Sequence, residues 1–272
     1  MSELGAATAP PGGMFAGLAD TAALAGRRLL HLRRAPGKFL GIVMNPLVLL
    51  IAVGYLFRNS ISVPGSGNYQ EYLMAGVAVQ VGLAGIGPTA IGVAMDMRGG
   101  LVDRFRSLPI SRTAVLAGQT LSDLIVSALG LALVMLVGLA VGWRPHADPL
   151  SVAGGFALIL AFIYTMLWVG VLIGLLLRSP ETIDSVGAIV LVAFSFLSNA
   201  FFSVQGLPSW IRPLAEWNPV SSVVTACRQL WGNPVVTGTG FPADHPVLVT
   251  AGTLAVLLAV CVPVSLRAYR TA

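Results

Sequence analysis

The sequence contains little charge and almost no lysine. Only 10% of its 272 residues are charged, against about 25% in an average soluble domain, while 56% are apolar and the mean hydropathy is +0.85. Its single lysine, Lys38, follows a glycine but lacks both the first glycine of a phosphate-binding P-loop and the Ser or Thr that comes after its lysine. The composition therefore excludes an ordinary soluble domain, and the lysine context excludes ATP hydrolysis by a P-loop in this chain.

Cysteine and histidine are also scarce. Cys227 falls in a predicted segment outside the membrane and Cys261 within an apolar stretch, so we expect no disulfide between them. The three histidines lie far apart in the sequence and have no metal-ligand spacing. No Ser-His-Asp or paired-carboxylate arrangement falls within one membrane layer. The sequence therefore predicts no enzyme active site, no bound metal and no cofactor of its own.

Long apolar stretches, by contrast, are abundant. Six uncharged stretches each approach or exceed the ~20 residues that cross a ~30 Å hydrocarbon layer as a helix. Backbone groups in lipid must be hydrogen-bonded within their own segment, which favours helices. We therefore predict an all-α membrane protein with six transmembrane helices in a single domain, residues 1–272. The stretches are 39–57, 72–95, 124–143, 150–177, 185–211 and 246–266.

Positive charge is unequal on the two sides that six helices create. Twelve of the sixteen Lys and Arg residues fall on the side that carries both termini, and four on the other side. The positive-inside rule therefore predicts that both termini are cytosolic. This asymmetry accounts for most of the net charge of +5, so no nucleic-acid partner is implied. Since no apolar leader precedes the first arginines, we expect the first stretch to remain as an anchor.

The segment 1–38 is predicted to be a cytosolic tail that ends in an amphipathic helix on the membrane surface. From Phe15 to Leu32, apolar residues repeat at alternating spacings of three and four, and Arg27 and Arg34 fall on the opposite side. Such a helix lies flat, with its apolar stripe in the headgroup layer and its cations toward anionic lipid. Anchoring to lipid is one role, and contact with a cytosolic subunit is a second.

A charged segment, DMRGGLVDRFRSLPISR at 96–112, separates the second and third stretches. Leu101, Phe105 and Leu108 fall at i, i+4 and i+7 and so share one face of a short helix, which Pro109 ends because it has no N–H. A short amphipathic helix on the cytosolic surface fits the groove of a soluble partner. An ordinary solvated loop with positive-inside charge is the alternative.

Few polar residues interrupt the apolar stretches. Asp123 is the one strong candidate for a membrane-buried carboxylate. Three roles are open for it: lining a hydrated cavity, pairing with an arginine, or reaching toward water. Pro88 predicts a kink or hinge, while Gly138–Gly142 and Gly170–Gly174 have the small-xxx-small spacing of close helix packing. The candidate pathway or gating residues are Asn45, Gln80, Pro88, Asp123 and Asn199.

The longest predicted segment outside the membrane core is 205–247. It is rich in tryptophan and aliphatic residues, and prolines at 208, 213 and 219 divide it into short helices. Apolar, Trp-rich helices of this kind lie at the interface or re-enter the membrane where protein buries them. The candidate residues of these external helices are Trp217, Asn218, Pro219 and Arg228.

Two segments resemble a known family. DMRGGLVDRFRSLPISRTAVLAGQTLSD at 96–123 and WNPVSSVVTACRQLWGNP at 217–234 are similar to the membrane subunit of type-2 ATP-binding-cassette (ABC) exporters, in particular the daunorubicin-resistance-like permeases of actinobacteria. The resemblance implies a homodimer that binds two copies of a separate cytosolic ATPase, which holds ATP and Mg²⁺. It also implies that a coupling helix contacts this ATPase through Gly100, Leu101, Asp103, Arg104, Phe105, Arg106, Leu108 and Pro109.

The resemblance further implies export across a bacterial cytoplasmic membrane. The expected substrate is a hydrophobic or amphipathic compound, such as an antibiotic or a lipid. The scarcity of polar residues in the stretches favours such a substrate over a lipid-linked glycan, which is the first alternative. An ion-coupled carrier that works alone and depends on Asp123 is the second alternative.

Overall fold

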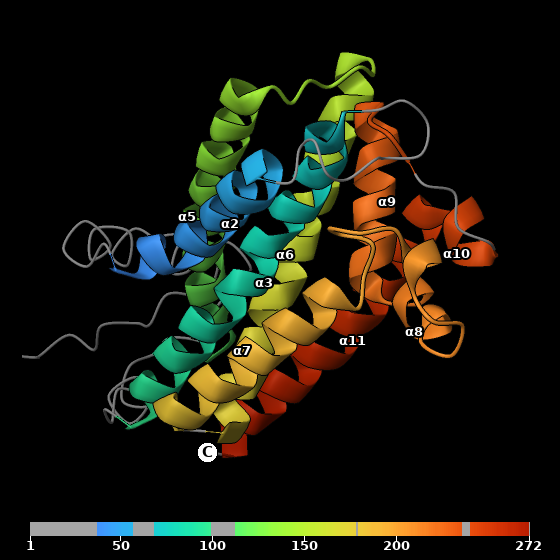
Figure 1. Cartoon of the computed structure of the whole chain (residues 1–272). Helices are drawn as coiled ribbons and strands as arrows, with labels where there is room; N and C mark the ends of the chain where they lie inside the picture. Colours follow the sequence, from blue (N-terminus) through green and yellow to red (C-terminus); the bar gives the residue numbers. More distant parts are fainter. Residues whose placement is uncertain (1–36, 57–67, 99–111, 178, 236–239, 272) are drawn as a thin grey trace, which may run out of the picture.

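The computed structural model describes residues 37–56, 68–98, 112–177, 179–235 and 240–271. In this part of the chain every regular element is a helix, and the long helices form one bundle (Figure 1). The predicted interfacial helix of 15–34 and the coupling residues of 100–109 lie outside the described residues. The helices are α2 (Gly37–Leu56), α3 (Tyr69–Arg98), α5 (Arg112–Val141), α6 (Pro149–Leu177), α7 (Pro180–Phe196), η1 (Val204–Gly206), α8 (Arg212–Glu216), α9 (Pro219–Trp231), α10 (Phe241–Asp244) and α11 (Pro246–Thr271).

Helix α3 is at the centre of the bundle. It contacts α2, α5, α6, α7 and α9, and most of its side chains are buried. Many of them are Ala or Gly, so neighbouring helices approach its backbone on several sides. A helix that is apolar all round is expected to be buried. The composition of α3 thus explains its central position.

Helix α6 packs on α3 through two of its glycines. A Cβ atom at Gly170 would lie 2.7 Å from the backbone oxygen of Ile86, and one at Gly174 would press against the backbone oxygen of Ala90. The structure therefore confirms the predicted packing role of this pair. In the pair Gly138–Gly142, the first residue packs against the Met74 side chain, whereas the second has a φ of +118° just after α5 ends.

We expect Gly170→Ala to lower the free energy of unfolding by about 1–3 kcal/mol, because the added methyl group meets backbone that cannot move aside. The measurement is the thermal unfolding midpoint of the purified protein in detergent. Gly154→Ala is the matched control in the same helix, since its Cβ would approach only Leu230, at 4.0 Å. The control should match or slightly exceed the native midpoint. Equal midpoints for the two variants would contradict the packing argument.

Within the described residues, four helical segments are long and apolar enough to cross a membrane. They contain nearly all of the second, third, fourth and sixth predicted stretches. The first stretch, 39–57, forms most of α2, whose apolar part Phe39–Tyr55 is shorter than these four. The chain is therefore a multi-pass helical membrane protein. The four segments are Tyr69–Arg98, Val115–Val141, Pro149–Leu177 and Pro246–Tyr269.

The fifth predicted stretch, 185–211, is not one helix, and that part of the prediction was wrong. Helix α7 begins earlier, at Pro180, where the Ser179 side chain accepts a hydrogen bond from a backbone N–H, and it ends at Phe196. There the Ser198 hydroxyl donates to the Ser195 carbonyl oxygen at 2.7 Å. The chain then turns back against α3, a contact that apolar periodicity does not reveal.

The predicted external segment, 205–247, contains the expected short helices, namely η1 in part, α8, α9 and α10. Helix α9 differs from the others because nearly all its side chains are buried, and it contacts α3, α6 and α11. Trp217, just before α9, is 65% exposed, whereas Trp231 at its end is fully buried. The segment thus combines an exposed apolar part with a helix inserted into the bundle.

Candidate functional site

The predicted coupling residues lie outside the described residues, but the helices on either side are described. Helix α3 ends at Arg98 and α5 begins at Arg112. The two helices contact each other, and Ala94 near the end of α3 packs with Ile183 of α7. Figure 1 shows the end of α3, the start of α7 and the end of α11 at the same end of the bundle. The segment 99–111 therefore connects two long, packed helices, α3 and α5.

Two of the candidate pathway residues connect neighbouring helices to α3. Gln80 donates from Nε2 to the Ser195 hydroxyl oxygen of α7 at 2.7 Å. Asp123 of α5 accepts a hydrogen bond from the Thr89 hydroxyl, also at 2.7 Å. Gln80 and Asp123 are only 1% and 3% exposed. One of the three roles predicted for Asp123 was that it reaches toward water along the helix surface. Its burial excludes that role.

The structure does not bring the five candidate pathway residues together. Asn45 and Pro88 are half-buried in α2 and α3. Asn199 lies beyond the end of α7, where its Nδ2 donates to the Thr225 hydroxyl oxygen of α9 at 2.7 Å. Gln80, Asp123 and Asn199 therefore make separate polar contacts, with Ser195, Thr89 and Thr225, and do not form one cluster. Their role in a pathway stays a prediction.

The Asn218-Pro219 pair connects the end of α7 to the start of α9. The Asn218 side-chain oxygen accepts from the Val220 N–H at 2.9 Å and so caps α9. Its Nδ2 donates to the carbonyl oxygens of Phe194 and Leu197, at 3.2 and 2.6 Å. These belong to the end of α7, where carbonyl groups lack helical partners. Pro219 then occupies the first turn of α9, which tolerates a missing N–H.

Arg228 is a buried hydrogen-bonding centre between α9, α3 and the chain beyond α7. It is 1% exposed. Its Nε donates to the Tyr72 carbonyl oxygen at 2.9 Å, and Nη2 donates to the carbonyl oxygens of Asn199 and Ala200 at 3.0 and 3.1 Å. The guanidinium lies 3.4 Å from the centre of the Tyr72 ring, in cation–π geometry. Arg228 is therefore a buried charge, although it belongs to a segment that was predicted to lie outside the membrane core.

Two tyrosines of α3 hold the same stretch of chain from the other side. The Tyr69 hydroxyl donates to the Phe201 carbonyl oxygen at 3.3 Å, and the Tyr72 hydroxyl donates to that of Asn199 at 3.1 Å. The main-chain amide of Asn199 in turn donates to the Ser221 hydroxyl oxygen at 3.1 Å. Residues 199–201 are therefore fixed between α3 and α9 through their backbone groups.

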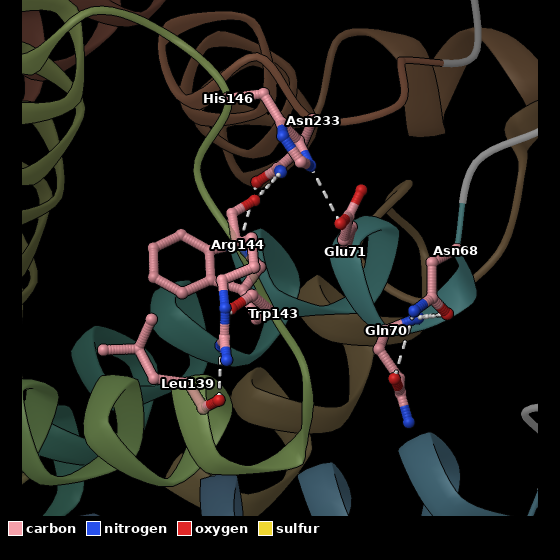
Figure 2. Close-up of polar contacts among 8 residues, drawn as sticks. All are labelled: Asn68, Gln70, Glu71, Leu139, Trp143, Arg144, His146 and Asn233. Carbon is pink, nitrogen blue, oxygen red and sulfur yellow. Dashed lines mark hydrogen bonds and ion pairs between the residues drawn. The ribbon is translucent and has the colours of Figure 1, made fainter.

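The end of α9 is attached to the link between α5 and α6 (Figure 2). The Trp143 indole N–H donates to the Asn233 side-chain oxygen at 2.8 Å, and Asn233 Nδ2 donates to the Arg144 carbonyl oxygen at 2.9 Å. Gly232 ends α9 with a φ of +67°, and a Cβ there would lie 2.8 Å from the Ala147 amide nitrogen. A glycine is therefore required here for both conformation and space.

A second contact at this end joins α3 to the same link. His146 Nε2 lies 2.9 Å from Glu71 Oε1, in the first turn of α3, as Figure 2 shows. Two residues further along, hydrogen bonds from the Ser151 backbone N–H and hydroxyl hold the pKa of Asp148 below its ordinary value. Asp148 therefore stays ionised at the start of α6, where a negative charge favours the helix.

Sequence reasoning missed several residues of this arrangement. Trp143, His146 and Asn233 were not candidates, and Tyr72 marked only the start of a stretch. The Trp-Gly-Asn-Pro order signals a helix end, but it does not say which other segment receives that end. Both cysteines are free, as expected, and both are buried.

The helices and the 217–234 arrangement define the class: a multi-pass membrane protein in which a short helix re-enters the bundle. The family model described as "ABC-2 type transporter" matches residues 20–230. The chain belongs to this family, and it is an ABC-transporter permease.

Named relatives agree with this assignment. The chain is 29% identical to the daunorubicin resistance ABC transporter permease protein DrrB1 of Streptomyces coeruleorubidus, over 90% of this chain and 83% of that protein. It is 26% identical to the doxorubicin resistance ABC transporter permease protein DrrB of Mycobacterium tuberculosis, over 71% of this chain and 68% of that protein. It is also 25% identical to the putative transport permease ycf38 of Porphyra purpurea, over 78% of this chain and 73% of that protein.

Proposed function

We propose that this permease is the membrane subunit of an ATP-driven exporter in a bacterial cytoplasmic membrane. In this proposal six helices cross the membrane, both termini are cytosolic, and two copies form the translocation pathway. Two copies of a separate ATPase bind ATP and Mg²⁺, since this chain has no P-loop of its own. The family match supports the proposal most strongly, because it includes the whole 96–112 segment.

Helix α3 is suited to transmit movement from the ATPase to the outer end. It is one 30-residue helix, about 45 Å long at 1.5 Å per residue. One end adjoins the coupling segment, and the other carries Tyr69 and Tyr72, which hold residues 199–201. In the proposed cycle, ATP binding brings the two ATPase copies together and shifts the coupling segments. Packed, rigid helices then convert that shift into outward opening.

A hydrophobic or amphipathic substrate is supported by an apolar groove at the junction of α7, α8 and α9. Its volume is ≈ 560 Å³, and it is a shallow groove that is open on one side. Apolar side chains form most of its wall, with Leu214 and Trp217 strongly exposed. Two relatives are named for resistance to daunorubicin and doxorubicin, and the proposed substrate is of this general kind. A lipid-linked glycan requires a more polar groove.

The test is uptake into inverted membrane vesicles that contain the permease, its ATPase partner or both. We expect uptake of doxorubicin, followed by its fluorescence, to require both proteins and ATP and to persist when a protonophore collapses the ion gradient. Asp123→Asn should retain uptake, because an amide oxygen still accepts the Thr89 hydroxyl. If uptake needs no ATPase and is lost with the protonophore and with Asp123→Asn, the protein is an ion-coupled carrier. Absence of doxorubicin uptake together with ATP-dependent glycan uptake supports the glycan alternative.

A further inference from the structure

Three polar side chains of α5 form a row inside one of the membrane-length segments, Val115–Val141. Gln119, Asp123 and Ser127 are spaced four residues apart and so share one face of the helix. All three are buried, and this face is turned toward α3. Polar side chains at membrane depth are costly, and buried ones are expected to have hydrogen-bond partners.

The members of this row differ in their partners. Asp123 accepts a hydrogen bond from the Thr89 hydroxyl of α3 at 2.7 Å. One turn to either side, the buried atoms Gln119 Nε2 and Ser127 Oγ have no hydrogen-bond partner in the described part of the chain. A buried donor without a partner costs free energy. Two such donors beside a buried carboxyl group are explained if they bind it in a second arrangement of the helices.

The contact between α3 and this row is made by the ends of side chains. A Cβ atom at Gly92 would lie 3.4 Å from Gln119 Nε2, and one at Gly85 would lie 3.6 Å from Ser127 Oγ. The contact between α3 and α6 is closer, because two glycines of α6 meet the backbone of α3 itself. Moving α3 along α6 would drive side chains into backbone. Moving it along α5 requires only that side chains rotate.

We propose that α3 slides along α5 during the transport cycle, and that Gln119 and Ser127 are positioning residues for this step. The role in transport rests on the proposed function. As Thr89 moves away from Asp123, Gln119 Nε2 or Ser127 Oγ donates to the carboxyl oxygen in its place. Such bonds between residues four apart on one helix are favourable. The displacement is at most one helical turn, about 6 Å for four residues.

The first test replaces the two unpartnered donors by apolar residues, in the variant Gln119→Leu/Ser127→Ala. It uses the complex of permease and ATPase in inverted membrane vesicles, with doxorubicin as the probe. We expect ATP-dependent uptake to fall about tenfold, as for the loss of one hydrogen bond in the displaced arrangement. The thermal unfolding midpoint should equal or exceed the native value, because the removed atoms have no partner in the arrangement described here.

Two control variants have different expected results. Thr120→Val changes a buried residue of α5 whose hydroxyl donates to the carbonyl oxygens of Leu116 and Ala117 in its own helix, and it should keep native uptake. Thr89→Val removes the donor that Asp123 uses now, so it should lower the unfolding midpoint. A lowered midpoint is the signature of a static structural bond, and the double variant should not show it.

The displacement is measured by pulsed electron spin resonance on the complex in lipid nanodiscs, first without nucleotide and then with ATP and vanadate. Nitroxide labels are attached at Met95→Cys and Leu136→Cys, two exposed positions that lie about 28 Å apart along the helix axes. Because α3 and α5 are antiparallel, sliding should change this distance by about 3–6 Å. The control pair, Met95→Cys with Leu150→Cys of α6, should change much less. Both native cysteines are first replaced by alanine, and labelled permease is diluted with unlabelled permease.

Native uptake by the double variant overturns the proposal. A lowered midpoint in that variant also overturns it, because both atoms would then have partners before any movement. So does an unchanged distance between the Met95 and Leu136 labels in a complex that exports doxorubicin. Failure of the proposed function gives a different result: the native complex shows no ATP-dependent uptake, whereas a distance change that the double variant abolishes still supports the sliding step.

Discussion

Replacing Leu101, Phe105 and Leu108 together by aspartate is expected to abolish co-purification of the permease with its ATPase partner. The three residues share one face of the predicted coupling helix. Full burial of each is worth about 1.5–3 kcal/mol, and an unpaired aspartate buried in the same contact adds a further cost. A loss of about 4 kcal/mol or more corresponds to a roughly thousandfold weaker complex. The measurement is an affinity pull-down of the co-expressed partner from detergent-solubilised membranes.

The matched control adds the same three charges elsewhere, by replacing Ala6, Ala7 and Ala9 with aspartate. This variant should co-purify with the partner as the native permease does. Both variants should reach the membrane in equal amounts and unfold at similar temperatures, so that a lost complex reports a lost contact. Retention of the partner and of transport by the Leu101, Phe105 and Leu108 variant refutes the coupling assignment. Labelling of a Ser107→Cys variant by an impermeant maleimide in intact cells also refutes it, because the segment would then face the exterior.

Replacing Arg228 by methionine is expected to lower the free energy of unfolding by about 3 kcal/mol. The substitution keeps much of the side-chain length but removes three donated hydrogen bonds and the cation above the Tyr72 ring. The carbonyl oxygens of Asn199 and Ala200 then lose a buried donor. For a protein of this size the change lowers the unfolding midpoint by on the order of 10 °C, measured on the purified protein in detergent.

Two further variants separate the parts of this effect. Arg228→Lys keeps the charge but not the planar fork of donors, so its midpoint should lie between those of the native protein and the methionine variant. Arg144→Met removes an exposed arginine that donates to the Leu139 and Trp143 carbonyl oxygens and should change the midpoint little. A native-like midpoint for Arg228→Met would show that water or a rearranged backbone satisfies the freed carbonyl groups.

The two candidate segments were predictable to different degrees. For 217–234, the sequence indicated short helices through its prolines. This feature depends on backbone geometry that each proline imposes on its neighbours. The burial of Arg228 was not predictable, because it depends on three carbonyl groups and a ring from distant parts of the chain. For 96–112, the proposed contact is with another protein, so only binding to that protein tests it.

The fifth apolar stretch shows a second feature that the sequence did not reveal, the end of a helix inside an uncharged stretch. Its uncharged residues 185–211 satisfied the length of a spanning helix, yet α7 ends at Phe196. Hydropathy measures the cost of moving each side chain into lipid, and it contains no information about contacts between segments. Here Tyr69 and Tyr72 bind the backbone of residues 199–201, and Asn218 binds the end of α7. These contacts compensate for the interruption of the helix.

The sequence by itself determined that this protein is helical and membrane-embedded and that it has no P-loop of its own. These properties follow from the length of apolar stretches and the absence of particular side chains, which are local quantities. The tertiary structure alone decided that α3 is the central helix, that α9 is inserted beside it, and that Arg228 is buried. These properties depend on which surfaces fit together, and residues far apart in the chain form each such fit.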